Sequence, residues 1–155
     1  DTDDSNKTLI EGTNVNVGFY YYPRFTSDNN HIVMAYYNYP TYVIYNYSLQ
    51  DNTSNIISSV LGVAYPSVVN ISPDDIVTYR IASGTSDQIV RNNLNGTEEV
   101  FLTSSFFDKR DSYLLNENIL LFTSNDNQAL YMKDLNTGVE KLLNNSISFT
   151  YFTVF

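Results

Sequence analysis

The strongest constraint on the fold is a repeat that runs through the chain in three copies. An apolar run begins at Ile32, at Ile76 and at Ile119, so successive copies start 44 and 43 positions apart. Each copy later reaches a polar turn followed by a short apolar segment. These turns lie at 49–53, 94–97 and 135–138. A repeat of this length must be identified before any single motif is interpreted, because the repeat determines the whole architecture.

Each repeat contains four short β-strand patterns separated by turn residues, which is typical of a propeller blade. We therefore predict an all-β chain of about three four-stranded blades, at 17–58, 62–103 and 104–143. In the first copy the strands are expected near 17–26, 31–38, 41–49 and 54–58, with equivalents one and two repeats later. Helix should be nearly absent.

Blades stack face to face, so their middle strands are covered on both sides and lose clean apolar/polar alternation. The runs 32–35 and 119–122 have this character. We expect one set of middle-strand side chains to be buried. It comprises Val33, Ile44, Val77, Ile89, Leu120 and Leu130.

The two ends do not complete a blade. Segment 7–11 is similar to a fourth strand, and segment 147–155 is similar to a first strand that is apolar on both faces. The 155 residues are thus a single repeat domain or a propeller fragment, with an orphan strand at each end. A free apolar edge invites pairing, so we expect 147–155 to be completed by a neighbouring chain or by further sequence.

One turn carries a family resemblance. The pattern Ser72-Pro73-Asp74-Asp75, followed by Tyr79 and by the segment 94–98, resembles the repeat of TolB-type β-propellers, in which a Ser-Pro-Asp-Gly turn joins the first two strands. The resemblance covers roughly 20–143 and is looser at 26–29 and 115–118. It implies a β-propeller, while the motif itself is structural and implies no chemistry. A β-sandwich whose repeats imitate blades is the alternative fold.

Composition agrees with β structure and excludes several functions. The chain has 14 Tyr, 9 Phe and only 16% charged residues. Its net charge of −9 argues against nucleic acid and anionic membrane as partners, which require a cationic surface. No apolar stretch reaches the roughly 20 residues of a membrane span. The absence of cysteine excludes disulfides and thiolate chemistry.

No catalytic, cofactor or metal site is predicted. His31 is the only histidine and has no Gly-x-Ser-x-Gly partner motif, so we interpret it as a solvated turn residue. Asp28, Asp74 and Asp75 recur at the first turn of a blade, where an Asp side chain caps backbone N–H groups. They do not have the spacing of an EF-hand loop or of a sialidase-type Asp box.

Tyrosine is concentrated in the first copy, which holds nine of the fourteen. Stacking on glycans or contact with a protein would use such side chains, because tyrosine combines a flat apolar body with a polar tip. Packing between blades is the interpretation we favour. The nine are Tyr20, Tyr21, Tyr22, Tyr36, Tyr37, Tyr39, Tyr42, Tyr45 and Tyr47.

Six Asn-x-Ser/Thr sequons are present, which is consistent with a secreted glycoprotein. Asn46 lies in the middle of a predicted strand and is the site least expected to be modified. The other five are predicted to lie in tails or turns. These glycosylation candidates are Asn52, Asn95, Asn70, Asn144 and Asn6.

The sequence therefore predicts a non-enzymatic binding or assembly module of the β-propeller type, secreted, at the cell surface or in the periplasm. Its expected partner is a protein, or another copy bound through the terminal strands, with a glycan as a further class. The alternative is an accessory propeller of a secreted hydrolase, or a glycan-binding module. No cofactor, nucleic acid or membrane insertion is expected.

Overall fold

The computed structural model describes residues 19–38, 41–61, 69–83, 86–103, 109–124 and 129–145. These ranges form twelve β-strands and no helix, and so no helix long and apolar enough to cross a membrane. The strands are β1 (Phe19–Phe25), β2 (His31–Asn38), β3 (Thr41–Ser48), β4 (Thr53–Leu61), β5 (Asn70–Ile71), β6 (Val77–Ser83), β7 (Ser86–Asn92), β8 (Val100–Phe101), β9 (Lys109–Asn116), β10 (Ile119–Ser124), β11 (Ala129–Asp134) and β12 (Glu140–Asn144).

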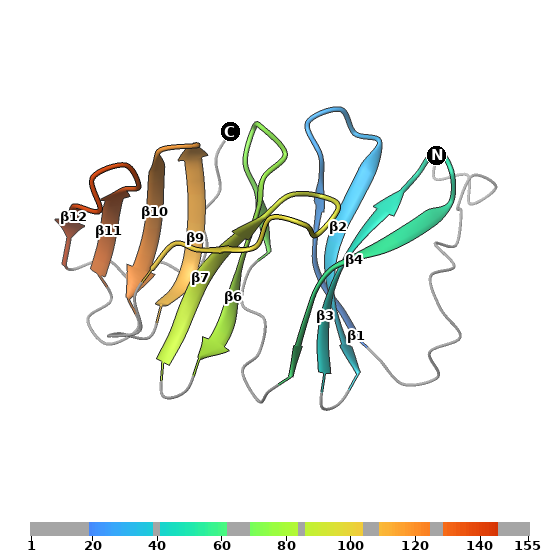
Figure 1. Cartoon of the computed structure of the whole chain (residues 1–155), viewed down its shortest axis with the longest axis horizontal. Helices are drawn as coiled ribbons and strands as arrows, with labels where there is room; N and C mark the ends of the chain where they lie inside the picture. Colours follow the sequence, from blue (N-terminus) through green and yellow to red (C-terminus); the bar gives the residue numbers. More distant parts are fainter. Residues whose placement is uncertain are drawn as a thin grey trace, which may run out of the picture.

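The strands form three antiparallel four-stranded sheets, each in simple sequence order (Figure 1). The first sheet contains β1 to β4, the second β5 to β8, and the third β9 to β12. The all-β class and the four-stranded repeat unit predicted from the sequence are confirmed. The strands predicted in the first copy correspond to β1, β2, β3 and β4.

Left-handed backbone at the turns explains the choice of turn residues. Asn29 and Asp75, with φ of 58° and 57°, occupy the position where the Ser-Pro-Asp-Gly pattern has glycine. Asn and Asp tolerate this conformation better than other residues with a side chain. The turns before the fourth strands use Asn52, Gly96 and Gly138 in the same way.

Two apolar cores lie between the sheets. The first joins Val33, Ala35 and Ile44 of the first sheet to Val77, Tyr79 and Val90 of the second. The second core joins the second sheet to the third. Its buried members are Ile89, Leu102, Leu114, Leu120 and Phe122. The sheets therefore pack face to face, with the second sheet covered on both sides, as expected for stacked blades.

The first strands of the three sheets lie next to one another, since β5 contacts both β1 and β9. Asn70 in β5 links them: its amide oxygen accepts a hydrogen bond from Arg24 Nε at 3.4 Å, and its amide nitrogen donates to the Ser112 carbonyl. In each sheet the fourth strand lies at the edge opposite the first strand, on what we call the outer side of the stack.

Polar contacts also join the first two sheets on their outer side. The Leu94 carbonyl accepts hydrogen bonds from the amides of Asn46 and Asn55, at 3.3 and 2.9 Å. The Ser58 hydroxyl of the first sheet donates to Glu99 of the second at 3.2 Å, and within the second sheet the Tyr79 hydroxyl also donates to Glu99, at 2.6 Å. Burial and this hydrogen bond raise the pKa of Tyr79 to about 12. These bonds fix the register of one sheet against the next.

Five of the six side chains predicted to be core are buried, and one is not. Leu130 is only half-buried. It lies on the face of the third sheet opposite Phe122 and Tyr131, which pack toward the second sheet. Among the described ranges, that opposite face has no further sheet against it. The prediction treated the third blade as though it had a neighbour on each side.

The interpretation of His31 as a solvated turn residue is wrong. His31 begins β2 and is half-buried, and its backbone closes the β1–β2 turn. Its N–H donates to Thr26 Oγ1 at 3.1 Å, and its carbonyl accepts from the Thr26 N–H at 3.1 Å. The predicted orphan strands at 7–11 and 147–155 lie outside the described residues.

Candidate functional site

Capping was predicted for Asp28, Asp74 and Asp75, and the structure confirms it for Asp28 and Asp75. Asp28 accepts hydrogen bonds from the Thr26 hydroxyl at 2.6 Å and from the Asn30 N–H at 2.9 Å. These bonds lower the pKa of Asp28 to about 2, the Thr26 hydroxyl having the largest effect. Asp75 accepts from the Ser27 N–H at 2.8 Å and so joins the first turns of two sheets.

The prediction that the Asp74 side chain caps its turn is wrong. In that turn the capping atom is the Ser72 hydroxyl, which accepts hydrogen bonds from the N–H groups of Asp74 and Ile76 at 3.3 and 3.1 Å. The Asp74 side chain is exposed. Within the described ranges, no group of three or more His, Cys, Asp or Glu residues is placed to hold a metal ion.

The sequons divide into exposed and buried positions. Asn52 and Asn95 are exposed in equivalent turns, and Asn144 is half-exposed at the end of β12. Asn46 is buried in β3, as expected. The prediction that Asn70 lies in a turn is wrong. Asn70 lies in β5 and is 4% exposed, and its side-chain amide forms hydrogen bonds to the two neighbouring sheets. Asn6 lies outside the described residues.

The tyrosines of β2 and β3 serve mainly in packing. Tyr36, Tyr42 and Tyr47 are buried, and Tyr45 packs against the cluster formed by Ile32, Met34 and Tyr47. The rings of Tyr37 and Tyr42 stack with their centroids 4.4 Å apart. Because the side chains of Tyr36, Tyr42 and Tyr47 are buried, they do not offer a surface for glycan stacking.

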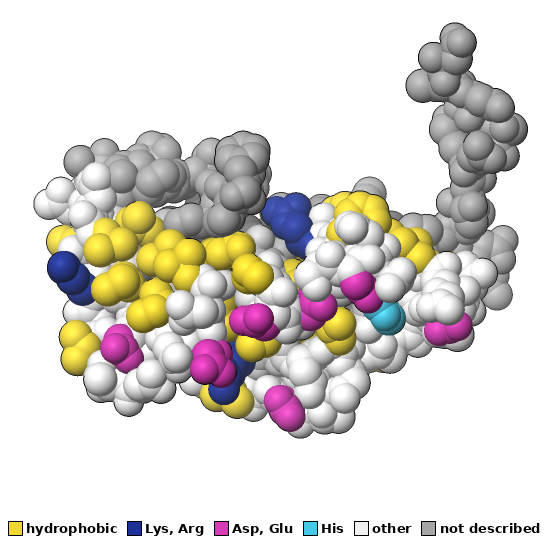
Figure 2. Space-filling model, turned by 90° about the horizontal axis from the view of Figure 1, so that it is seen from above, with side chains coloured by type: hydrophobic (Ala, Val, Ile, Leu, Met, Phe, Trp, Pro, Cys, Tyr) yellow, Lys and Arg dark blue, Asp and Glu magenta, His cyan; other side chains and the backbone are white. Residues whose placement is uncertain are grey.

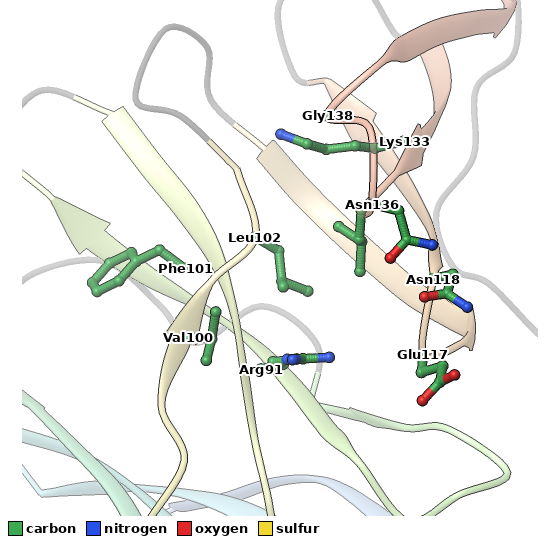
Figure 3. Close-up of a pocket in the computed structure, with 10 residues that line it drawn as sticks. Arg91, Val100, Phe101, Leu102, Glu117, Asn118, Lys133, Asn136 and Gly138 are labelled. Carbon is green, nitrogen blue, oxygen red and sulfur yellow. The ribbon is translucent and has the colours of Figure 1, made fainter.

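A groove of about 490 Å³ lies on the outer side of the molecule, between the second and third sheets (Figure 3). We call it the outer groove. One wall is formed by β7, β8 and the residue that follows β8, and the other by the β9–β10 and β11–β12 turns. Its lining residues are Arg91, Val100, Phe101, Leu102, Glu117, Asn118, Lys133, Leu135, Asn136 and Gly138.

The floor of the outer groove is the outer end of the second core. Leu102 belongs to that core and Leu135 packs against it. Val100 in the wall is 41% exposed, and the face in Figure 2 shows a concentration of hydrophobic side chains over one half of the molecule. The groove therefore offers apolar area that a ligand could remove from water.

Two cations face the outer groove. Arg91 is half-buried, and among the described residues no carboxylate forms an ion pair with it. Lys133 pairs with Glu140 at 3.1 Å. Figure 3 shows the Arg91 side chain directed from the second sheet toward the wall that carries Glu117. The guanidinium is thus the group most available to a ligand carboxylate.

Sequence reasoning did not find this groove. Its walls come from turns and outer strands of two different repeats, and neither repeat alone shows that they meet. The available signal was the pair Val100-Phe101, which is apolar on both faces in a fourth strand expected at the surface.

Comparison with known proteins identifies the class of fold. No family model matches the sequence, and no curated protein does so either. Solved structures do match, and they include TolB proteins with this stacked-sheet arrangement. The chain therefore has a TolB-type β-propeller fold; the sequence repeat predicted the propeller, and the resemblance of the 72–75 turn implied the TolB type.

TolB from Acinetobacter baumannii is 23% identical with a TM-score of 0.65, over 80% of this chain and 32% of TolB. A puromycin hydrolase is 11% identical with a TM-score of 0.68, over 81% of this chain and 22% of the hydrolase. The isopeptidase AtxE2 is 9% identical with a TM-score of 0.64, over 79% of this chain and 28% of its own. The chain thus spans about a third or less of each structure, and these identities show a shared fold alone.

Proposed function

We propose that this protein is a non-enzymatic, propeller-type binding module that acts through protein–protein contacts outside the cytoplasm. The observation that supports the proposal is the outer groove, with its apolar floor at Leu102 and Leu135 and with the Arg91 guanidinium, which forms no ion pair within the described part of the chain. Apolar area next to a few polar groups that fix orientation is the usual composition of a protein-binding surface.

The proposal is tested by photo-cross-linking in the organism that makes the protein. A photoreactive amino acid at position 100, whose side chain faces the outer groove, is expected to capture one recurring protein. The matched control is position 50, where Gln50 is exposed in the β3–β4 turn of the first sheet. No adduct at 100, or the same adducts at both positions, would contradict the proposal.

The second candidate is an accessory propeller of a hydrolase. It is favoured by the similarity to parts of a puromycin hydrolase and of an isopeptidase, both much longer than this chain. The mass and sequence of the polypeptide isolated from its source distinguish the two candidates. A polypeptide that continues into a hydrolase domain would support the second candidate and contradict a non-enzymatic role.

Self-association is the other form of assembly that the sequence suggests. The segment 147–155 is apolar on both predicted faces, and we propose that pairing in trans covers it. A variant truncated after Asn145 is then expected to lose the oligomer while it keeps its β-sheet signal in circular dichroism. An intact protein that elutes as a monomer, and is unchanged by the truncation, would contradict self-association.

The location outside the cytoplasm gives a prediction about sugars. If the source glycosylates, Asn52 and Asn95 should carry glycans because both are exposed in turns. Asn46 and Asn70 should be bare because both are buried. Glycopeptide mass spectrometry of the native protein tests this, and bare Asn52 and Asn95 from a glycosylating source would remove this support for an extracellular location.

A further inference from the structure

The outer strand of the second sheet has one edge that no other described strand pairs with. Within the described ranges β8 pairs with β7 alone, through Val90–Phe101 and Arg91–Val100. The Leu102 N–H donates to the Ile89 carbonyl at 2.8 Å. Because hydrogen-bonded and non-bonded pairs alternate in an antiparallel ladder, the N–H and carbonyl of Phe101 point away from β7.

This edge strand is short, at two residues, but it carries neither the charged side chains nor the proline that also protect an edge against strand pairing. Its two residues are apolar and exposed, with Val100 at 41% and Phe101 at 51%. Alternation directs Val100 to the outer groove and the Phe101 ring to the opposite face, and Figure 3 shows that ring pointing out of the groove. A segment added along β8 would therefore bury apolar area on both of its faces.

The groove beside this edge limits the charge of such a segment. Arg91 is paired with Val100 across the ladder, so its guanidinium lies on the same face as the groove. It suits one carboxylate of the added segment, through a charge-assisted hydrogen bond. Glu117 on the opposite wall repels a strongly acidic segment, and the charge of Lys133 is already neutralised by Glu140.

We infer that the partner of the outer groove is an extended peptide segment that adds to β8 as a fifth strand of the second sheet. This inference rests on the proposed function and specifies its ligand. The segment bonds to the free N–H and carbonyl of Phe101, places an apolar side chain over Leu102 and Leu135, and sets a single carboxylate against Arg91.

The test is selection of a library of random linear peptides against the purified full-length protein, followed by titration of the enriched peptides. Phe101→Pro removes the outward N–H at a position where an edge strand tolerates proline, whereas Phe101→Ala removes the same ring and keeps the N–H. We expect Phe101→Pro to bind at least about tenfold more weakly than Phe101→Ala.

Two variants that each remove one charge test the proposed side-chain contacts of the segment. Arg91→Gln should weaken binding about tenfold, and Glu117→Gln should strengthen binding of the same peptides. Peptides that bind Phe101→Pro and Phe101→Ala equally would overturn strand addition while leaving the proposed function intact. Failure to enrich any peptide would count against both. A dimer of the protein itself that Phe101→Pro dissociates would show that a second copy, and not a peptide, occupies the edge.

Discussion

At the scale of the residue, Asp28 shows how a single carboxylate organises a turn. Its carboxylate accepts hydrogen bonds from the Thr26 hydroxyl, from the Asn30 N–H and from the Asn30 side-chain amide, the last at 2.9 Å. Each of these bonds favours the ionised carboxylate, which is why the pKa of Asp28 falls from 3.8 to about 2. The turn is therefore stabilised by a charge that is present at neutral pH.

The lowered pKa of Asp28 predicts a particular dependence of stability on acid. The stabilising contribution of Asp28 is complete above its unfolded-state pKa of 3.8 and is lost as the pH falls toward about 2. Asp28→Asn should therefore be less stable than the wild type at neutral pH, and the difference should shrink near pH 2. Urea denaturation at the two pH values measures it. Asp74→Asn, at an exposed position in the equivalent turn, serves as the control and should differ little at either pH.

At the scale of the element, Gly96 and Gly138 illustrate how one turn can have two different roles. Both residues precede a fourth strand with positive φ, at 79° and 73°. A Cβ at Gly96 would lie 2.7 Å from the Ile57 carbonyl oxygen, whereas a Cβ at Gly138 would meet nothing within 4 Å. The Gly96 turn is thus pressed against the first sheet, and the Gly138 turn beside the outer groove is open.

The contrast gives a matched pair of variants. Gly138→Ala should cost only the left-handed backbone strain, about 1–2 kcal/mol of unfolding free energy. Gly96→Ala adds an overlap with backbone that cannot rotate away, so its cost should be larger, about 3 kcal/mol or more. Chemical denaturation measures both. Equal losses would contradict the close packing of this turn against Ile57.

The repeat predicted the strands well because each strand pattern is local and recurs three times. What the repeat could not predict depends on contacts between copies. The burial of Asn70 follows from hydrogen bonds to two other sheets, and the half-burial of Leu130 from an uncovered sheet face. The groove around Arg91 likewise needs the turns of the next copy. Periodicity identifies the blade, but only packing identifies the surface between blades.

At the scale of the whole molecule, Asn70 connects all three sheets near their first strands. It lies 4% exposed between Arg24 and Ser112, so truncating it leaves a buried carbonyl without its donor. Asn70→Ala should lower the unfolding free energy by about 1–3 kcal/mol. Asn136→Ala, in an exposed turn, should change it by about 0.5 kcal/mol or less. A loss no larger at Asn70 than at Asn136 would mean that this link does not stabilise the stack.

The central claim is that partners bind on the outer side of the stack, between the second and third sheets, rather than near the first strands. Hydrogen–deuterium exchange of the protein, with and without the partner captured at position 100, tests it most directly. We predict protection concentrated at 99–102 and 133–138, which flank the outer groove. Protection confined to β1, β5 and β9, with the outer groove unchanged, would contradict it.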